Sequence, residues 1–307
     1  MPAPAGLARF HVVRICSLLP SATEIVADLG LVDALVGVSA ECRWPPEVVG
    51  KPVVTAARFD PSEMSSVEID DTVRASIADG RSLYAVDAEL MRELQPDVIV
   101  TQDLCAVCAV SSGELATACP VGADVISLDP RTYRDVAASV QLLATRLGAA
   151  ERGEVIARAM LAVLEQTSHA VRGLPVRRVF FAEWIEPPFC AGHWLPEMIA
   201  AAGGLDVLGR RGEPSFATTW DAVIEREPEL VIAGPCGFGV EEAATRAAPL
   251  DVPVPVVAVD GDSYYSRPAP RLADGVRQLA HLFHPDAVPD TGLPAIRLAH
   301  TKASAVR

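Results

Sequence analysis

The sequence predicts an α/β protein made of two lobes that a long, rigid helix joins. Short apolar runs alternate with amphipathic segments, which is typical of parallel strands connected by helices. The apolar runs fall into two groups, and a region without a strand pattern, residues 132–172, separates them. We therefore expect two Rossmann-like lobes, with an N-terminal lobe over 1–148, a connecting helix over 149–173, a C-terminal lobe over 174–284 and a loose tail over 285–307.

Each predicted strand is a short apolar run, and several of these runs end in a polar or glycine-rich turn. In open α/β sheets, ligands bind at the carboxyl ends of the strands, where such turns lie. The first group of strands covers 14–19, 35–40, 97–102 and 124–129, and the second covers 177–184, 229–234 and 254–260.

The region between the two groups predicts two helices rather than one. Between Leu147 and Ile156 the helical phase advances by about half a turn, so one straight helix would present its two apolar stripes on opposite faces. Gly148 is a suitable end for the first helix. The second helix would be roughly 36 Å long at 1.5 Å per residue, which suits a connector between lobes.

Composition and charge exclude several classes of partner. The formal net charge is −14, so the chain repels nucleic-acid phosphates and anionic membrane surfaces. No apolar run approaches the roughly 20 residues of a membrane-spanning helix. The first ten residues, MPAPAGLARF, have no leader pattern, so the sequence as written predicts a cytoplasmic protein. A periplasmic or extracellular protein would require a start further upstream.

The seven cysteines are an odd number at irregular spacings, which argues against structural disulfides. Cys105 and Cys108 form a C-x-x-C pair, but the chain lacks the surrounding pattern of a thioredoxin-type redox site. Together with Cys42 and Cys236 they follow the carboxyl ends of predicted strands. The four thiols are thus candidate ligands for a thiophilic metal or an iron–sulfur cluster. The alternative is that they line a pocket or pack under loops.

Several motifs together resemble one protein family. They are SLLPSATEIVADLGLVDALVGVSAECRWPPEV, ELQPDVIVTQ, RRVFFAEWIEPPFCAGHWLPEMIAAAGGLDVLG, SFATTWDAVIEREPELVIAG and YYSRPAPRLADGVRQLA. In this order they resemble the helical-backbone substrate-binding proteins of ABC importers, most closely the cobalamin-binding branch. The resemblance implies a cleft between the lobes that holds cobalamin, or another corrinoid or tetrapyrrole, without catalysis. It also implies an ABC permease as partner if the protein is exported.

The resemblance implies a set of ligand-binding residues. Trp44 and Phe189 stand at positions where an aromatic ring packs on the ligand, and aromatic walls suit a flat macrocycle. His193 is a candidate ligand for cobalt or another metal, or else makes local hydrogen bonds. Arg267, with Arg271, either grips the ligand or braces the lobe through carboxylates. Further candidates near the cleft are Tyr84, Gln102, Glu183, Trp184, Trp194 and Phe216.

Two acids align with the outward-facing carboxylates that dock onto arginines of the permease in this family. They are Glu89 in the first lobe and Asp221 in the second. Opposite charges at such a contact steer association and fix its register. The alternative is that both are ordinary solvated surface acids.

The segment LLPSATEIV predicts a strand that turns directly into a helix. We expect Pro20 to end the strand, Ser21 or Thr23 to cap the helix, and Glu24 to lie in its first turn.

The main prediction for function is therefore non-catalytic binding of a corrinoid or related tetrapyrrole. No Ser/His/Asp set or diagnostic carboxylate pair indicates an enzyme. The alternative is a cytosolic, thiol-lined metal or iron–sulfur protein on the same scaffold.

Overall fold

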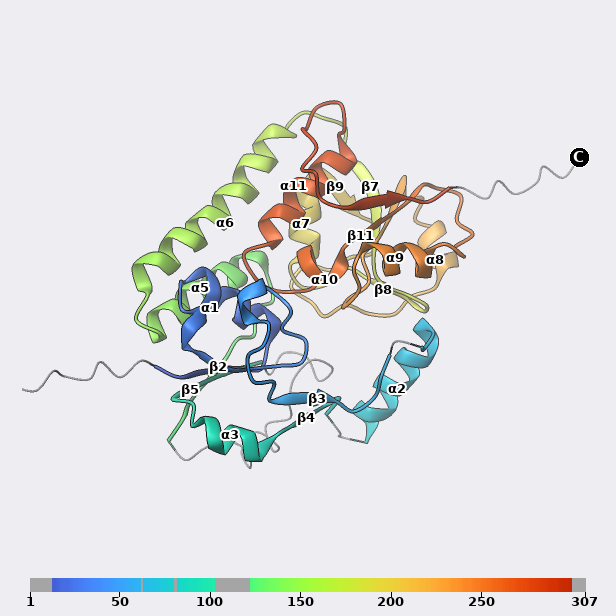
Figure 1. The fold of residues 1–307 in the computed structure, drawn as a ribbon. Helices are drawn as coiled ribbons and strands as arrows, with labels where there is room; N and C mark the ends of the chain where they lie inside the picture. The colour runs from blue at the N-terminus through green and yellow to red at the C-terminus, as the bar shows by residue number, and fades with distance from the viewer. Residues whose placement is uncertain (1–12, 62, 80–81, 103–121, 300–307) are drawn as a thin grey trace, which may run out of the picture.

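The computed structural model describes residues 13–61, 63–79, 82–102 and 122–299. Two sheets lie at the centres of two lobes, the first in blue to green and the second in yellow to red (Figure 1). Both sheets are mainly parallel and carry helices, which confirms the predicted two-lobed α/β fold. Within these residues no helix is both long and apolar enough to cross a bilayer.

The N-terminal lobe is built on a parallel sheet with the strand order β2-β1-β5-β6. Its two inner strands are buried along their whole length, as expected when helices cover a parallel sheet on both sides. The strands are β1 (Ile15–Ser17), β2 (Leu35–Val38), β5 (Val98–Thr101) and β6 (Asp124–Ser127), and helices α1 (Pro20–Asp28) and α3 (Ala88–Leu94) accompany them. A ribbon of β3 (Thr55–Ala57) and β4 (Tyr84–Val86) flanks helix α2 (Ser66–Ala78).

The start of α1 differs from the expectation. The helix begins at Pro20 itself, and Leu19 is the N-cap residue without a side-chain cap. Proline fits the first helical position because its fixed φ is already helical and it has no N–H to satisfy there. Glu24 consequently lies beyond the first turn of α1, and its side chain points toward the other lobe.

The C-terminal lobe has β10 at its centre, with β7 and β11 parallel to it on either side. Residues 295–297 form β12, which pairs antiparallel with β11, and Ile296 is half-buried against the lobe's core. These residues therefore do not belong to the loose tail that the sequence predicts for 285–307. The strands are β7 (Arg177–Ile185), β8 (Pro188–Cys190), β9 (Gly204–Asp206), β10 (Leu230–Ala233), β11 (Val256–Val259) and β12 (Ala295–Arg297). The helices are α7 (Leu195–Ala201), α8 (Trp220–Ile224), α9 (Val240–Ala247), α10 (Gly261–Tyr264) and α11 (Leu272–Phe283).

Two antiparallel helices follow the first sheet, α5 (Tyr133–Arg146) and α6 (Ala150–Ala170), as the sequence predicts, and α6 falls within the range 149–173 expected for the connecting helix. Gly148 separates them with a φ of 75°, which glycine adopts without strain. Helix α6 packs against α5 and also against α7 and α11 of the second lobe, along one side of the molecule (Figure 1). A Cβ on Gly153 would lie 2.2 Å from the Cβ of Ala144, so the glycine permits the close approach of α5 and α6.

A buried ion pair joins the two lobes directly. The Glu24 carboxylate, 2% exposed, accepts hydrogen bonds from Arg271 Nε at 2.9 Å and Arg271 Nη2 at 2.5 Å. Arg267 Nη1 lies 3.5 Å from the same carboxylate, and Asp262 holds the Arg267 guanidinium at 2.6 Å. Glu24 comes from α1 of the first lobe and the arginines from the second, so these contacts fix how the lobes meet.

We expect Glu24→Gln to lower the free energy of unfolding by about 3 kcal/mol, because it leaves buried guanidinium charge without its carboxylate. Urea unfolding followed by circular dichroism measures this loss. Asp274→Asn is the matched control, because the Asp274–Arg277 pair has side chains 47% and 49% exposed and exposed pairs contribute less than about 1 kcal/mol. Equal losses in the two variants would contradict the structural role of Glu24.

Candidate functional site

The carboxyl ends of both sheets face the boundary between the lobes. Glu24 and Cys42 follow β1 and β2, whereas Arg267 follows β11. Arg267 Nη2 donates to the Glu41 carbonyl oxygen across the boundary, at 3.3 Å. Loops at this edge are where open α/β sheets bind ligands. The boundary is therefore the candidate site.

Trp44 lies at this boundary and keeps its ring accessible. The Arg271 guanidinium carbon is 5.0 Å from the centroid of the Trp44 ring and 5.6 Å from that of Tyr264. Both distances are within the range of cation–π attraction. Trp44 remains 44% exposed, so its ring has surface left for a further contact.

Both arginines brace the lobes, which is one of the two roles considered for them. Arg267 is 7% exposed and is held by Asp262 and Glu24. Although burial lowers the pKa of Arg271, its hydrogen bonds to Glu24 and the Glu24 charge raise that pKa overall. A direct contact between Arg267 and a ligand stays a prediction.

Trp184 and Phe189 lie together at one edge of the second sheet. They face each other in the register of β7 and β8, and both are half-buried. The Trp184 indole N–H donates to the Ser66 carbonyl oxygen of the first lobe at 3.2 Å, so this edge also reaches the boundary. Phe189 pairs further with Ala217 in an isolated bridge.

Three other aromatic candidates pack within their own lobes. Trp194 is 7% exposed, and its indole N–H donates to the Tyr265 carbonyl oxygen at 2.8 Å, so it belongs to the core rather than to a cleft wall. Phe216 packs against the core of the second lobe, with Arg210 4.3 Å above its ring. Tyr84 packs against the cluster beneath β1 and β5. Trp194 is buried, whereas Phe216 and Tyr84 are half-buried, and a contact of these rings with a ligand stays a prediction.

The polar candidates have local partners or are buried. The Glu183 carboxylate accepts a hydrogen bond from the Gly192 N–H at 2.5 Å, and Gln102 is 9% exposed at the end of β5. His193 has a φ of 48°, and its N–H donates to the Glu213 carbonyl oxygen at 2.7 Å. Burial, together with the charge of Arg131, lowers the pKa of His193. Its ring is therefore neutral at pH 7, the form that binds a metal.

The described thiols do not form a metal site. Cys42 is 8% exposed, and its sulfur lies 3.0 Å from Thr23 Oγ1 and 3.4 Å from Ser39 Oγ. Burial raises the pKa of Cys42, so the thiol is protonated in the metal-free protein. Cys236 is exposed, and Cys105 and Cys108 lie outside the described residues. In the described ranges no three His, Cys, Asp or Glu side chains gather to hold a metal, and the iron–sulfur alternative is not supported.

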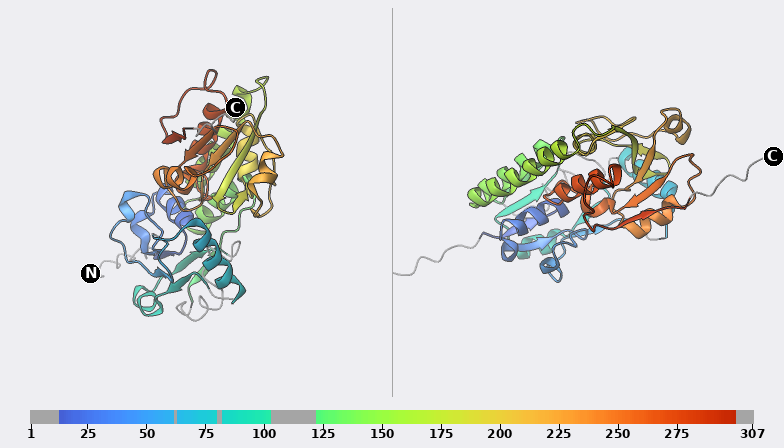
Figure 2. Two further views of the ribbon diagram at one scale, coloured as in Figure 1. Left: turned by 90° about the vertical axis from the view of Figure 1, so that its right-hand side faces the viewer. Right: turned by 90° about the horizontal axis from the view of Figure 1, so that it is seen from above.

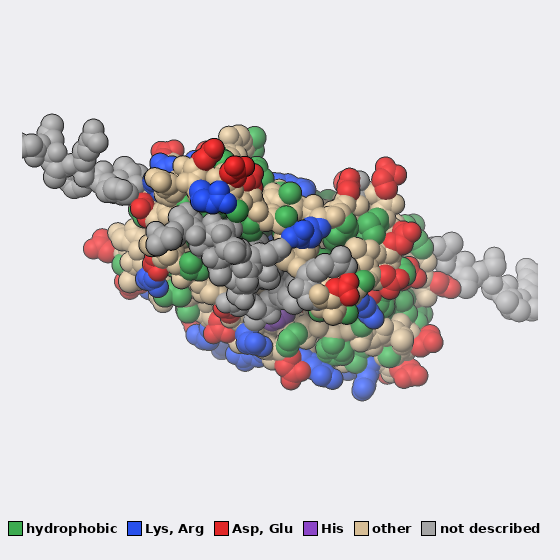
Figure 3. Space-filling model, turned by 90° about the horizontal axis from the view of Figure 1, so that it is seen from below, with side chains coloured by type: hydrophobic (Ala, Val, Ile, Leu, Met, Phe, Trp, Pro, Cys, Tyr) green, Lys and Arg blue, Asp and Glu red, His purple; other side chains and the backbone are tan. Residues whose placement is uncertain are grey.

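Glu89 and Asp221 are exposed acids on different lobes, in the first turns of α3 and α8. Their contact with a permease stays a prediction. On the face seen from below, the described acidic and basic side chains are mixed (Figure 3), and the described part of this face shows no continuous basic patch of the kind that binds nucleic acid.

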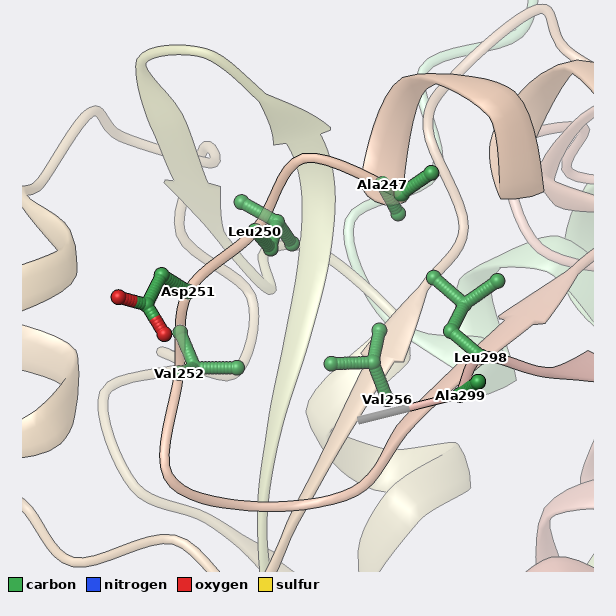
Figure 4. Close-up of a pocket in the computed structure, with 8 residues that line it drawn as sticks. Ala247, Leu250, Asp251, Val252, Val256, Leu298 and Ala299 are labelled. Carbon is green, nitrogen blue, oxygen red and sulfur yellow. The ribbon is translucent and has the colours of Figure 1, made fainter. Parts of the chain in front are cut away.

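Two pockets lie away from this boundary, at the amino ends of strands in the second lobe. One has a volume of about 20 Å³, which is room for roughly one water molecule (Figure 4). The other, about 350 Å³, lies among α8, the start of β10 and residues 252–254. No predicted site residue lines either of them.

The sequence alone misses some residues that join the lobes through contacts between distant parts of the chain. Glu197 of α7 accepts a hydrogen bond from the Tyr133 N–H at the start of α5, at 2.6 Å. Arg246 of α9 donates to Ser66 Oγ of the first lobe at 3.2 Å. A glutamate in a helix's first turn is a common capping pattern, and no local signal distinguishes Arg246 from a surface arginine.

The chain is similar in sequence to proteins that are named for the ligand they bind. No family model matches the chain. The vitamin B12-binding protein of Vibrio cholerae is 25% identical over 288 residues, which cover 90% of this chain and 91% of that protein. The vitamin B12-binding protein of Pectobacterium carotovorum is 23% identical over 274 residues, covering 87% and 86%.

Solved structures show the same fold. The periplasmic heme-binding protein RhuT from Roseiflexus sp. RS-1 has a TM-score of 0.65 and 22% identity, covering 90% of this chain and 99% of that one. The periplasmic vitamin B12 binding protein BtuF of Vibrio cholerae has a TM-score of 0.63 and 21% identity, covering 88% and 96%. In sequence the chain is similar to vitamin B12-binding proteins, and in fold it is similar to two-lobed periplasmic binding proteins.

Proposed function

We propose that the protein binds a corrinoid between its lobes and delivers it, unchanged, to an ABC permease. The observation that carries this proposal is the similarity to vitamin B12-binding proteins over 90% of the chain. Solved neighbours are described as binding vitamin B12 or heme, which supports a tetrapyrrole as the ligand class.

The side chains at the boundary support a large, flat ligand. Trp44 offers an exposed ring from the first lobe, and Trp184 and Phe189 offer half-buried rings from the second. Such rings pack well on a macrocycle. His193, with its pKa lowered, is the residue that would ligate the cobalt.

Charge favours a corrinoid over a haem. The Glu183 carboxylate stands among the candidate residues, and the whole chain has a formal net charge of −14. A haem carries carboxylates, which the Glu183 carboxylate and the negative net charge would repel. The amide side chains of a corrinoid, in contrast, can donate hydrogen bonds to Glu183 and Gln102.

The described location of similar proteins supports a periplasmic place of action. The solved relatives RhuT and BtuF are described as periplasmic, which gives no support to the expected cytoplasmic location. We assign the protein to the same side of the membrane as the external face of its permease.

Trp44→Ala should weaken binding of cyanocobalamin by about tenfold, because it removes a stacking contact of about 1.4 kcal/mol. Isothermal titration of purified protein with cyanocobalamin, and in parallel with haemin, measures this. Val49→Ala is the control, because Val49 is 76% exposed in the same loop and should leave the affinity unchanged. If the wild-type protein binds neither compound, the proposed function is wrong.

Replacing Glu89 and Asp221 together by arginine should leave the affinity for cyanocobalamin unchanged and lower uptake by at least about tenfold, because two ion pairs with the permease become repulsive. Uptake of labelled cyanocobalamin by vesicles that contain the cognate permease measures this. A control with Glu165→Arg and Asp286→Arg makes the same change of charge at exposed positions on the connecting helix and beyond α11. Equal uptake by both double variants would refute the docking role.

A further inference from the structure

Helix α2 is attached only lightly to its own lobe. Of its 13 residues, Ser66 and Ile69 are the two that are buried, while Val67 and Ile77 are each 41% exposed. A capping box between Ser65 and the Glu68 side chain stabilises the start of the helix locally. The helix can therefore keep its structure without extensive packing against the N-terminal sheet.

The other lobe holds the start of α2. The Trp184 indole N–H donates to the Ser66 carbonyl oxygen at 3.2 Å. Arg246 Nη1 donates to Ser66 Oγ and Arg246 Nη2 to the Met64 carbonyl oxygen, both at 3.2 Å. These three hydrogen bonds cross between lobes at positions up to 182 residues apart in the chain.

The two donors from the second lobe are fixed in place by their surroundings. The Arg246 side chain is 10% exposed and is paired with Glu242 at 2.7 Å. Its guanidinium lies 4.3 Å above the Phe238 ring, whose centroid is 5.6 Å from that of Trp184. Trp184, Phe238 and Arg246 thus form a stacked surface on which the start of α2 rests.

This contact lies on the side of the molecule away from the connecting helices. Both Figure 1 and Figure 2 place α2 at one side of the lobe boundary and α6 at the other. On the α6 side, covalent connections and a continuous core join the lobes. On the α2 side, the hydrogen bonds described above attach a lightly packed helix, so we expect this side to open at lower free energy.

We propose that α2 is a gate, and that Trp184 and Arg246 hold it closed over the ligand. This inference rests on the proposed function, because it needs a ligand that enters and leaves between the lobes. A gate that closes equally over the empty and the filled site slows entry and exit by the same factor. Its signature is therefore a change in both rate constants with little change in affinity.

Arg246→Ala should raise the association and dissociation rate constants of cyanocobalamin by about tenfold each, the effect of losing two hydrogen bonds. Stopped-flow absorbance measures the rates. Arg158→Ala is the control, because Arg158 forms the same i,i+4 pair with a glutamate on α6 and is 67% exposed.

Rates that are unchanged in Arg246→Ala would overturn the gate. So would a faster dissociation alone, because that result means that Arg246 contacts the ligand itself.

Hydrogen exchange in the ligand-free protein separates this proposal from the proposed function. In Arg246→Ala, the amides of α2 should exchange about tenfold faster, while those of α6 keep their wild-type rates. Failure of the wild-type protein to bind any tetrapyrrole would refute the proposed function, and the exchange result would still test whether Arg246 holds the α2 gate closed. Unchanged exchange in α2 would refute the gate, whatever the protein binds.

Discussion

The arrangement of the lobes depends on the ion pair between the buried Glu24 carboxylate and Arg271. A carboxylate that is 2% exposed is stable only beside positive charge, and Arg271 supplies that charge from the other lobe with two hydrogen bonds. The same guanidinium stacks on Trp44. The interaction that fixes the lobes therefore also positions the aromatic ring that we assign to the ligand.

The two sides of the boundary differ in how firmly they are held. On one side, Gly153 lets α5 and α6 pack closely, and α6 continues against α7 and α11, so a continuous core links the lobes. On the other side, α2 contacts the second lobe through the Ser66 region. A protein built in this way can admit a ligand by moving one helix, without a large rotation of the lobes.

The main strands and the two connecting helices could be predicted, because their apolar residues repeat over lengths that periodicity can detect. Strands β3, β4, β8, β9 and β12 could not, since each is a three-residue segment outside the longer apolar runs on which the prediction rests. The sequence does not distinguish Trp194, a core residue, from a cleft residue, because a tryptophan suits a core and a ligand wall equally well. The first-lobe partners of Arg246, Ser66 and Met64, lie at least 180 residues earlier, and no local pattern carries that information.

The most direct test is a crystal structure of the protein grown with cyanocobalamin. Our account predicts a corrin ring between Trp44 of the first lobe and Phe189 of the second, with the Glu24–Arg271 pair intact beneath it. A corrinoid bound at the outer pocket among α8, β10 and residues 252–254, or lobes that meet with no space for a macrocycle, would contradict it.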